Sequence, residues 1–273
     1  MPYRHAHWWI LALFPFAAFA FWPGYLSILS SSPPSFHLHG ITASLWLILL
    51  AIQSWSIHHG HRAFHKTNGL VSLALFPLFL AGGATIFVGM AERYVSGFSP
   101  FHEIWPPNLA WLDFVAVGGV AYFYFQALKY RRFVGKHSSY LLATAIFLLP
   151  PIFGRLAPIP MGLDFSNPEA FAQMGPSFHL GNLVSVLIAF AIAASDRRNG
   201  KPWVIAGLLT IAASILFEVP GGTAAWKSIY VHAAGIQVLP MAITAALAGA
   251  AIGWAGWVAG KKPTAPAPDI VPA

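Results

Sequence analysis

The 273-residue chain has the composition of a membrane protein. Charged residues make up 8% and hydrophobic residues 57% of it, whereas a soluble domain carries roughly 25% charged residues. Because the chain has 0 Cys, a disulfide framework, a thiolate zinc site and an iron–sulfur cluster are all excluded. Any metal would have to be bound by imidazole or carboxylate.

Eight segments are apolar enough to cross a bilayer, and the fifth and seventh of them are short. A crossing needs about 20 apolar residues, since backbone groups cannot stay unpaired in lipid. The sequence therefore predicts an all-α integral membrane fold of eight transmembrane helices over residues 1–260, followed by a disordered cytoplasmic tail at 261–273. In chain order the predicted spans are Trp8–Leu29, Leu38–Ile57, Leu70–Ala91, Leu109–Leu128, Ser139–Gly154, His179–Ser195, Trp203–Phe217 and Tyr230–Gly260.

The basic residues predict the orientation of these spans. With the N-terminus inside, twelve Lys and Arg fall on the cytoplasmic side, and only Arg93, Arg155 and Lys227 fall on the outer side. Cytoplasmic loops of membrane proteins are enriched in Lys and Arg. We therefore expect a multi-pass protein of the bacterial inner (cytoplasmic) membrane with both termini cytoplasmic. We therefore attribute the net charge of +7 to the cytoplasmic loops and not to nucleic-acid binding.

A five-residue sequence occurs twice in the chain. The sequence Pro-Ser-Phe-His-Leu occurs at Pro34–Leu38 and again at Pro176–Leu180, each time at the start of an inward-going span. One interpretation is two related four-helix halves, residues 1–137 and 138–260. The other is a chance match, because the remaining sequence of the two halves aligns poorly.

The twelve His residues form one belt at each membrane face. Ionisable residues at membrane depth are costly and tend to mark function. The outer belt consists of His37, His39, His102, His179 and His232, and the inner belt of His5, His7, His58, His59, His61, His65 and His137.

In the outer belt, carboxylates accompany the imidazoles. Asp113 lies about one turn inside the fourth span, where Arg155 and the outer His are its available partners. Mixed imidazole and carboxylate ligands suit iron or zinc. The sequence thus offers His37, His39, His179, His232 and Asp113 as metal ligands. The alternative is that these groups only complete hydrogen bonds at helix ends.

Within the inner belt, His65 and His137 differ from the rest because each opens an outward-going span, so the two can face each other across a bundle. For His58 and the other inner imidazoles we favour attraction to lipid headgroups. Familiar metal spacings such as HExxH are absent from the sequence.

Part of the chain resembles a group of uncharacterised bacterial multi-pass inner-membrane proteins. The resemblance covers roughly residues 36–155 and implies no established activity. It rests on an FHxHG opening, a Gln later in the same span, an H-[RK]-x-x-G start to the next span and a KHxxxLLAT segment, matched here by Phe36–Gly40, Trp46, Gln53, His65-Lys66 with Gly69, and Lys136-His137 through Leu141–Thr144.

The placement of the His residues is also similar to that in the di-haem cytochrome b561 proteins, which hold one haem b near each face. This resemblance implies outer haem ligands at His37 or His39 with His179, and inner ligands at His65 with His137. The sequence departs from that pattern, since these His lie at the ends of spans and not a turn or two inside.

Two classes of function follow from these features. One is a haem- or metal-binding redox protein with its histidine-rich site near the outer face. The other is a non-enzymatic transporter or sensor that uses the same His and Asp groups for a small solute or a proton. Expected partners are the lipid bilayer and a small-molecule ligand or quinone, with no role for nucleic acid.

Overall fold

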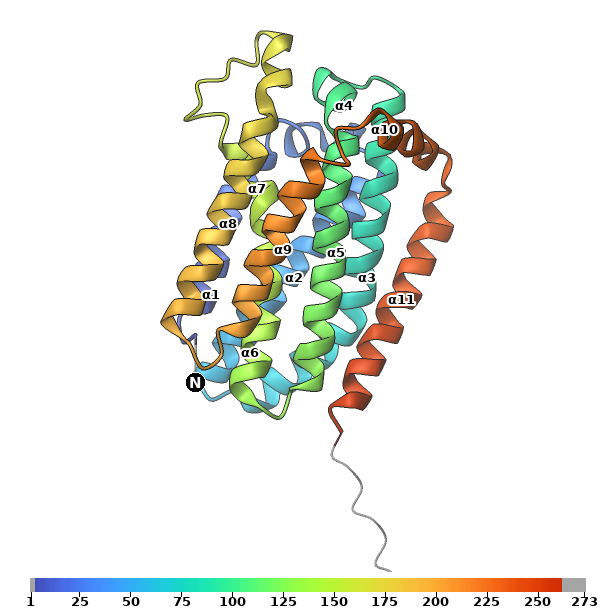
Figure 1. Ribbon diagram of the computed structural model, residues 1–273. Coiled ribbons are helices and arrows are strands. Elements are labelled where there is room, and N and C mark those ends of the chain that lie inside the picture. Colours follow the sequence, from blue (N-terminus) through green and yellow to red (C-terminus); the bar gives the residue numbers. More distant parts are fainter. Residues whose placement is uncertain (1–2, 262–273) are drawn as a thin grey trace, which may run out of the picture.

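The computed structural model describes residues 3–261, and these form a bundle of long helices with short helices at one end (Figure 1). Residues 3–261 contain no β-strand. In chain order the helices are α1 (Ala6–Phe21), η1 (Leu26–Ser31), α2 (Pro34–His58), α3 (Arg62–Val95), α4 (Pro100–Ile104), α5 (Pro106–Lys129), α6 (Val134–Ala143), η2 (Thr144–Leu148), α7 (Leu149–Leu156), η3 (Pro168–Met174), α8 (Gly175–Ser195), α9 (Lys201–Glu218), α10 (Ala224–Tyr230), η4 (Val231–Gly235) and α11 (Val238–Ala259), where η denotes a 3-10 helix.

Within residues 3–261, 7 helical segments are long and apolar enough to cross a membrane. One of them combines α6, η2 and α7 into a single segment of 23 residues, and another joins η3 to α8. Helix α1 is apolar but has only 16 residues. The predicted all-α multi-pass architecture is confirmed at this level.

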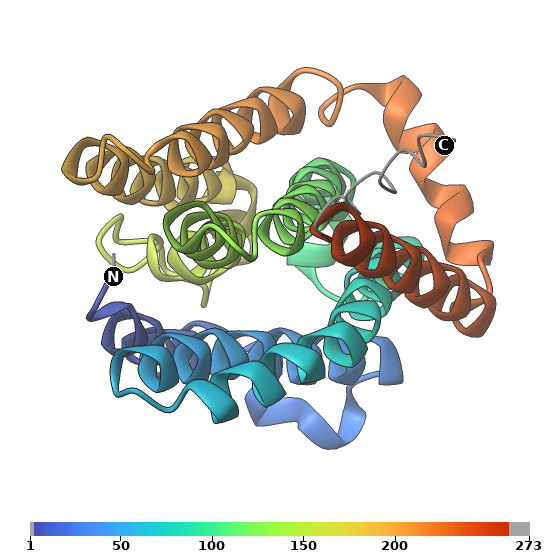
Figure 2. The same cartoon turned by 90° about the horizontal axis from the view of Figure 1, so that it is seen from below.

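The helices are arranged around a centre made of α5 and the α6–α7 segment (Figure 2). Helices α1, α2 and α3 lie on one side of this centre and α8 and α9 on the other, while α11 packs on α3 and α5. The described chain begins and ends at the same end of the bundle, which we call the terminal face (Figure 1). The opposite end, the loop face, carries α4, η3, α10 and η4.

Two predicted spans extend well beyond the long helices found there. The first span, predicted to reach Leu29, ends at Phe21, because the Pro23-Gly24 turn follows it and η1 starts a separate segment. The last span, predicted from Tyr230, begins at Val238, because Ile236 and Gln237 are extended.

The fifth span, predicted as short, is a full-length but irregular segment. It runs over Val134–Leu156 and contains a 3-10 helical stretch at Thr144–Leu148. Pro150 and Pro151 follow that turn, and a proline cannot donate the backbone hydrogen bond that a continuous α-helix requires. The irregularity is therefore encoded locally.

The two copies of the repeated Pro-Ser-Phe-His-Leu sequence lie at the starts of α2 and α8. Both helices run from the loop face to the terminal face (Figure 1). The relation of the halves 1–137 and 138–260 stays a prediction. Of the tail predicted at 261–273, residues 262–273 lie outside the described part of the chain.

Close helix packing depends on glycine at the contact between α7 and α8. A Cβ atom on Gly181 would lie 2.7 Å from the Pro150 carbonyl oxygen and 2.8 Å from Gly154 Cα. Both are backbone atoms that cannot move aside without shifting a helix. Small residues at such positions let membrane helices approach closely.

Replacing Gly181 with alanine should therefore destabilise the bundle. We expect Gly181→Ala to lower the free energy of unfolding by about 1–3 kcal/mol, the usual cost of overpacking. Reversible denaturation in detergent micelles measures it. The matched control is Gly118→Ala, where a Cβ would meet nothing within 4 Å, and equal effects of the two substitutions would contradict this account of the contact.

Candidate functional site

A cavity of about 350 Å³ opens near the terminal face, enclosed by α2, α3, α5 and α6 with one residue of α11. Its size lies within the range of small-molecule and cofactor sites. Aliphatic residues form much of its wall. The side chains with polar groups that line it are Gln53, Ser54, His58, His65, Lys66, Ser72, Tyr124, Arg131, His137, Ser138 and Trp257.

Two of its imidazoles are held by neighbouring helices. His65 Nδ1 donates to the Gln53 carbonyl oxygen of α2 at 3.2 Å, and His137 Nδ1 donates to the Ala127 carbonyl oxygen of α5 at 2.8 Å. A carbonyl only accepts, so the proton of each ring is on Nδ1 and the neutral ring leaves Nε2 free as a ligand atom. The two rings are within electrostatic reach of each other.

Gln53 makes two hydrogen bonds with His65. Its backbone carbonyl accepts from the ring, and its Nε2 donates to the His65 carbonyl oxygen at 3.2 Å. Gly69, one turn further along α3, leaves room for this side chain, since a Cβ there would lie 3.3 Å from Gln53 Nε2. The Gln and the H-[RK]-x-x-G motif seen in the sequence therefore form a single contact unit.

His58 is a cavity residue that the sequence analysis missed. Its Nδ1 donates to Ser54 O of its own helix at 2.7 Å, and its Nε2 is buried without a partner. His59 makes the same intrahelical bond to Trp55 O, but it is exposed. The signal that distinguishes them is spacing, because His58 shares a helical face with Gln53 and Ser54.

An aromatic layer separates the cavity from the loop-face half of the bundle. Tyr124 hydrogen-bonds Ser72 at 2.8 Å and stacks on Phe76 at a centroid distance of 4.1 Å. Trp46 stacks on Phe79 at 5.4 Å, and its Nε1–H donates to Thr144 Oγ1 at 3.0 Å. Motif residues distant in the sequence thus meet at and just above one cavity.

The outer histidines, in contrast, have separate surroundings. His37 Nδ1 pairs with the Tyr25 hydroxyl at 2.8 Å. His39 lies against Gly82 of α3, and its Nδ1 is buried without a partner. His179 Nε2 meets Glu218 Oε1 at 2.6 Å across α8 and α9. His232 is exposed in η4.

These positions do not form the shared metal site predicted from His37, His39, His179, His232 and Asp113. Nowhere in residues 3–261 do three His, Asp or Glu side chains come together as a possible metal site. The physical reason is that α2 and α8 lie on opposite sides of the bundle (Figure 2). The outer haem ligands that the cytochrome b561 resemblance implied, His37 or His39 with His179, come from these same two helices, and that pair stays a prediction.

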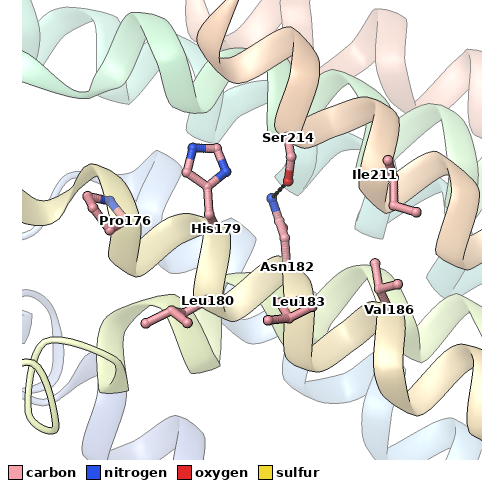
Figure 3. A pocket seen from close by; sticks show the side chains of 8 residues that line it. All are labelled: Pro176, His179, Leu180, Asn182, Leu183, Val186, Ile211 and Ser214. Atoms are coloured by element: carbon pink, nitrogen blue, oxygen red, sulfur yellow. Dashed lines mark hydrogen bonds between the residues drawn. The ribbon is translucent and has the colours of Figure 1, made fainter.

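His179 instead borders a groove of about 650 Å³ between α8 and α9 (Figure 3). The walls of the groove are largely aliphatic, with Leu180, Leu183 and Ile211 exposed at the surface of the bundle. Within the groove Asn182 Nδ2 donates to Ser214 Oγ at 2.7 Å. This is a surface that suits a lipid chain.

Asp113 is a partly buried residue of α5 in the loop-face half of the bundle, and Arg155 of α7 is within its electrostatic reach. Their charged atoms are more than 4.0 Å apart, because the sole ion pair within that distance in residues 3–261 is His179 with Glu218. Arg155 was among the partners that the sequence offered for Asp113.

Comparison with known proteins gives no relative: no protein-family description, no curated protein and no solved structure matches the chain.

At the loop face, His102 is buried, with 9% of its surface exposed, and its Nδ1 pairs with Ser99 Oγ at 2.7 Å. Burial first, and then the charges of Arg93 and Arg155, lower the pKa of His102 to about 4. An unfolded chain would bind this proton near the ordinary value of about 6.5. Stability should therefore be lost as pH falls from about 6.5 to 4.

Replacing His102 should remove that pH dependence. We expect His102→Gln to flatten the unfolding free energy between pH 6.5 and 4 by an amount on the order of 3 kcal/mol. Urea denaturation at several pH values measures it, with exposed His232→Gln as the control. An unchanged slope in His102→Gln would show that the folded protein binds this proton as readily as the unfolded chain does, and would contradict the lowered pKa.

Proposed function

We propose that this chain is a redox protein of the bacterial inner membrane that binds haem b in the terminal-face cavity through His65 and His137. The observation that carries the proposal is the pair of interhelical Nδ1 bonds, which orient both rings and leave both Nε2 atoms free. Haem takes two axial imidazoles, so a cluster of three ligands is not required.

The topology that we propose has eight crossings with both termini cytoplasmic. Helix α1, with 16 residues, would supply the eighth crossing, and at 1.5 Å per residue it is about 24 Å long. Such a length is marginal for a bilayer core of about 30 Å and needs slight local thinning. The twelve-to-three distribution of Lys and Arg supports the terminal face as the cytoplasmic one.

The remaining lining of the cavity fits haem. Leu49, Leu128, Leu141 and Leu142 offer apolar contact for a macrocycle. Lys66 and Arg131 line the same cavity and can neutralise carboxylates such as haem propionates. When bound, haem iron supplies one-electron transfer.

The chain's own residues would set the properties of this site. The Gln53 and Ala127 carbonyls fix the tautomer and orientation of the two rings, and such hydrogen bonds raise the basicity of imidazole ligands. The buried Tyr124 and Ser72 close the inner end of the cavity. Both ligand residues are partly buried, which limits the access of water and so affects reduction potential.

The experiment is an absorption spectrum and a pyridine haemochrome analysis of the purified protein. We expect one haem b per chain, with a Soret band lost or strongly shifted in His65→Ala and in His137→Ala. The control is His61→Ala, an exposed ring at the same face that stacks on Trp55. A folded but colourless protein, or a spectrum unchanged in both variants, would contradict the proposal.

The second candidate function is a transporter or sensor for a small solute or proton. The observation that favours it is the electrostatic coupling of Asp113 on α5 with Arg155 on α7, neither of which lines the terminal-face cavity. Ionisable groups in such positions commonly line the pathways of transporters. A colourless protein whose solute binding is lost in Asp113→Asn would support this candidate over the first.

A further inference from the structure

The groove between α8 and α9 has a polar edge, formed by His179, Asn182 and Ser214 (Figure 3). None of the residues that line this groove belongs to the terminal-face cavity. Leu180 and Leu183 of the groove are exposed at the surface of the bundle, so in a membrane the groove opens to lipid. A ligand of the groove would therefore have to be soluble in the bilayer.

Within the groove, one side-chain amide lacks a hydrogen-bond partner. Asn182 of α8 is buried, with 3% of its surface exposed, and its Nδ2 donates to Ser214 Oγ of α9 at 2.7 Å. Its Oδ1 is buried and accepts no hydrogen bond. Rotating the amide by half a turn would only exchange the two atoms and leave Nδ2 unpaired instead. Nearly all buried polar atoms in folded proteins have a partner, so this amide calls for one.

One turn nearer the loop face, His179 provides a second polar group. Its Nε2 lies 2.6 Å from Glu218 Oε1 of α9. Because a carboxylate only accepts, the ring donates from Nε2, and the neutral ring keeps Nδ1 as an acceptor. No other hydrogen bond involves this ring in residues 3–261. The groove thus offers two acceptors, His179 Nδ1 and Asn182 Oδ1, at neighbouring positions on one helix.

The position and charge of these groups limit the head group of a ligand. Asn182 is seven residues after the start of α8 at Gly175, which is about 10 Å along the helix at 1.5 Å per residue. A phospholipid head group stays at the membrane surface, and the Glu218 carboxylate beside the groove would repel its phosphate. The chemistry that fits is a neutral head group with two hydroxyl donors on an apolar chain.

We propose that the groove binds an isoprenoid quinol. One hydroxyl group of the quinol donates to His179 Nδ1 and the other to Asn182 Oδ1, while its chain lies along the aliphatic wall at Leu183 and Val186. The two hydroxyl groups are on opposite edges of one ring, which suits acceptors at neighbouring positions of a helix. The oxidised quinone carries two carbonyls and no donor, so both hydrogen bonds require the reduced form. This site goes beyond the haem proposal and does not depend on it.

Isothermal titration calorimetry tests the proposal on the purified protein in phosphatidylcholine nanodiscs, under anaerobic conditions and with empty nanodiscs as the blank. The probe is decylubiquinol, and decylubiquinone and dioleoylglycerol are compared with it. We expect saturable binding of the quinol and about tenfold weaker binding of the quinone, since the quinone donates to neither acceptor. Dioleoylglycerol, a neutral hydroxyl lipid with acyl chains, should not displace the quinol.

A matched pair of leucine substitutions tests the apolar wall. Leu183→Trp fills the groove and should abolish saturable binding of the quinol. The control is Leu187→Trp, one turn further along α8, where the side chain is exposed but lies outside the groove. This variant should bind the quinol as the unaltered protein does.

Two further substitutions test the polar edge. His179→Phe keeps an aromatic ring but removes both nitrogen atoms, and Asn182→Leu keeps the size of the side chain but removes the amide. Each should weaken quinol binding about tenfold and quinone binding less, because only the quinol donates to these groups. His232→Phe, which replaces an exposed imidazole of the same face, is the control.

The proposal is overturned by heat no larger than that of empty nanodiscs, or by full-strength quinol binding in Leu183→Trp. It is overturned equally if His179→Phe and Asn182→Leu both bind the quinol as the unaltered protein does. Displacement of the quinol by dioleoylglycerol would also overturn it, because the groove would then be a site for acyl chains. None of these results would bear on haem binding, which is measured by the absorption spectrum.

Discussion

A polar group in an apolar helical bundle is stable only where another part of the chain supplies its partner. The interhelical bonds of His65 to Gln53 and of His137 to Ala127 meet this constraint, and they tie α3 to α2 and α6 to α5. The same four helices enclose the terminal-face cavity. The bonds that satisfy these imidazoles thus also determine which nitrogen atoms face the cavity.

The aromatic layer gives the bundle two chemically different ends. Trp46, Phe76 and Tyr124 are almost fully buried between them. Toward the terminal face, two cavity imidazoles, His65 and His137, are held by backbone carbonyls of neighbouring helices. Toward the loop face, the carboxylate of Glu218 pairs with His179, and Asp113 and Arg155 are within electrostatic reach of each other. The haem that we propose at the terminal face therefore shares no residue with the polar groups of the loop face.

The fold class could be predicted from the sequence because hydropathy and helix length follow directly from the cost of unpaired backbone groups in lipid. The ends of the helices were harder to predict. Ile236 is apolar and Gln237 is uncharged, so a hydropathy profile does not show that their backbone is extended. The break at Thr144–Leu148 could have been placed, because Pro150 and Pro151 require it.

The site was predictable in part, for a similar reason. His65 and His137 were expected to face each other because both open outward-going spans, and they do line one cavity. His37 and His179 belong to the same repeated sequence and were expected at the same depth in the membrane. They have different neighbours, because α2 and α8 lie on opposite sides of the bundle (Figure 2). Sequence spacing determines the depth of a residue in the membrane, whereas the packing of the helices determines which residues meet.

In the haem site that we propose, two imidazoles of this chain, from α3 and α6, ligate one iron. Low-temperature electron paramagnetic resonance of the oxidised protein tests it most directly, since axial ligands determine the spin state of ferric haem. We predict a low-spin ferric signal typical of two imidazole ligands, converted to high spin in His137→Ala. A high-spin signal in the unaltered protein, or a low-spin signal that persists in both His65→Ala and His137→Ala, would contradict the claim.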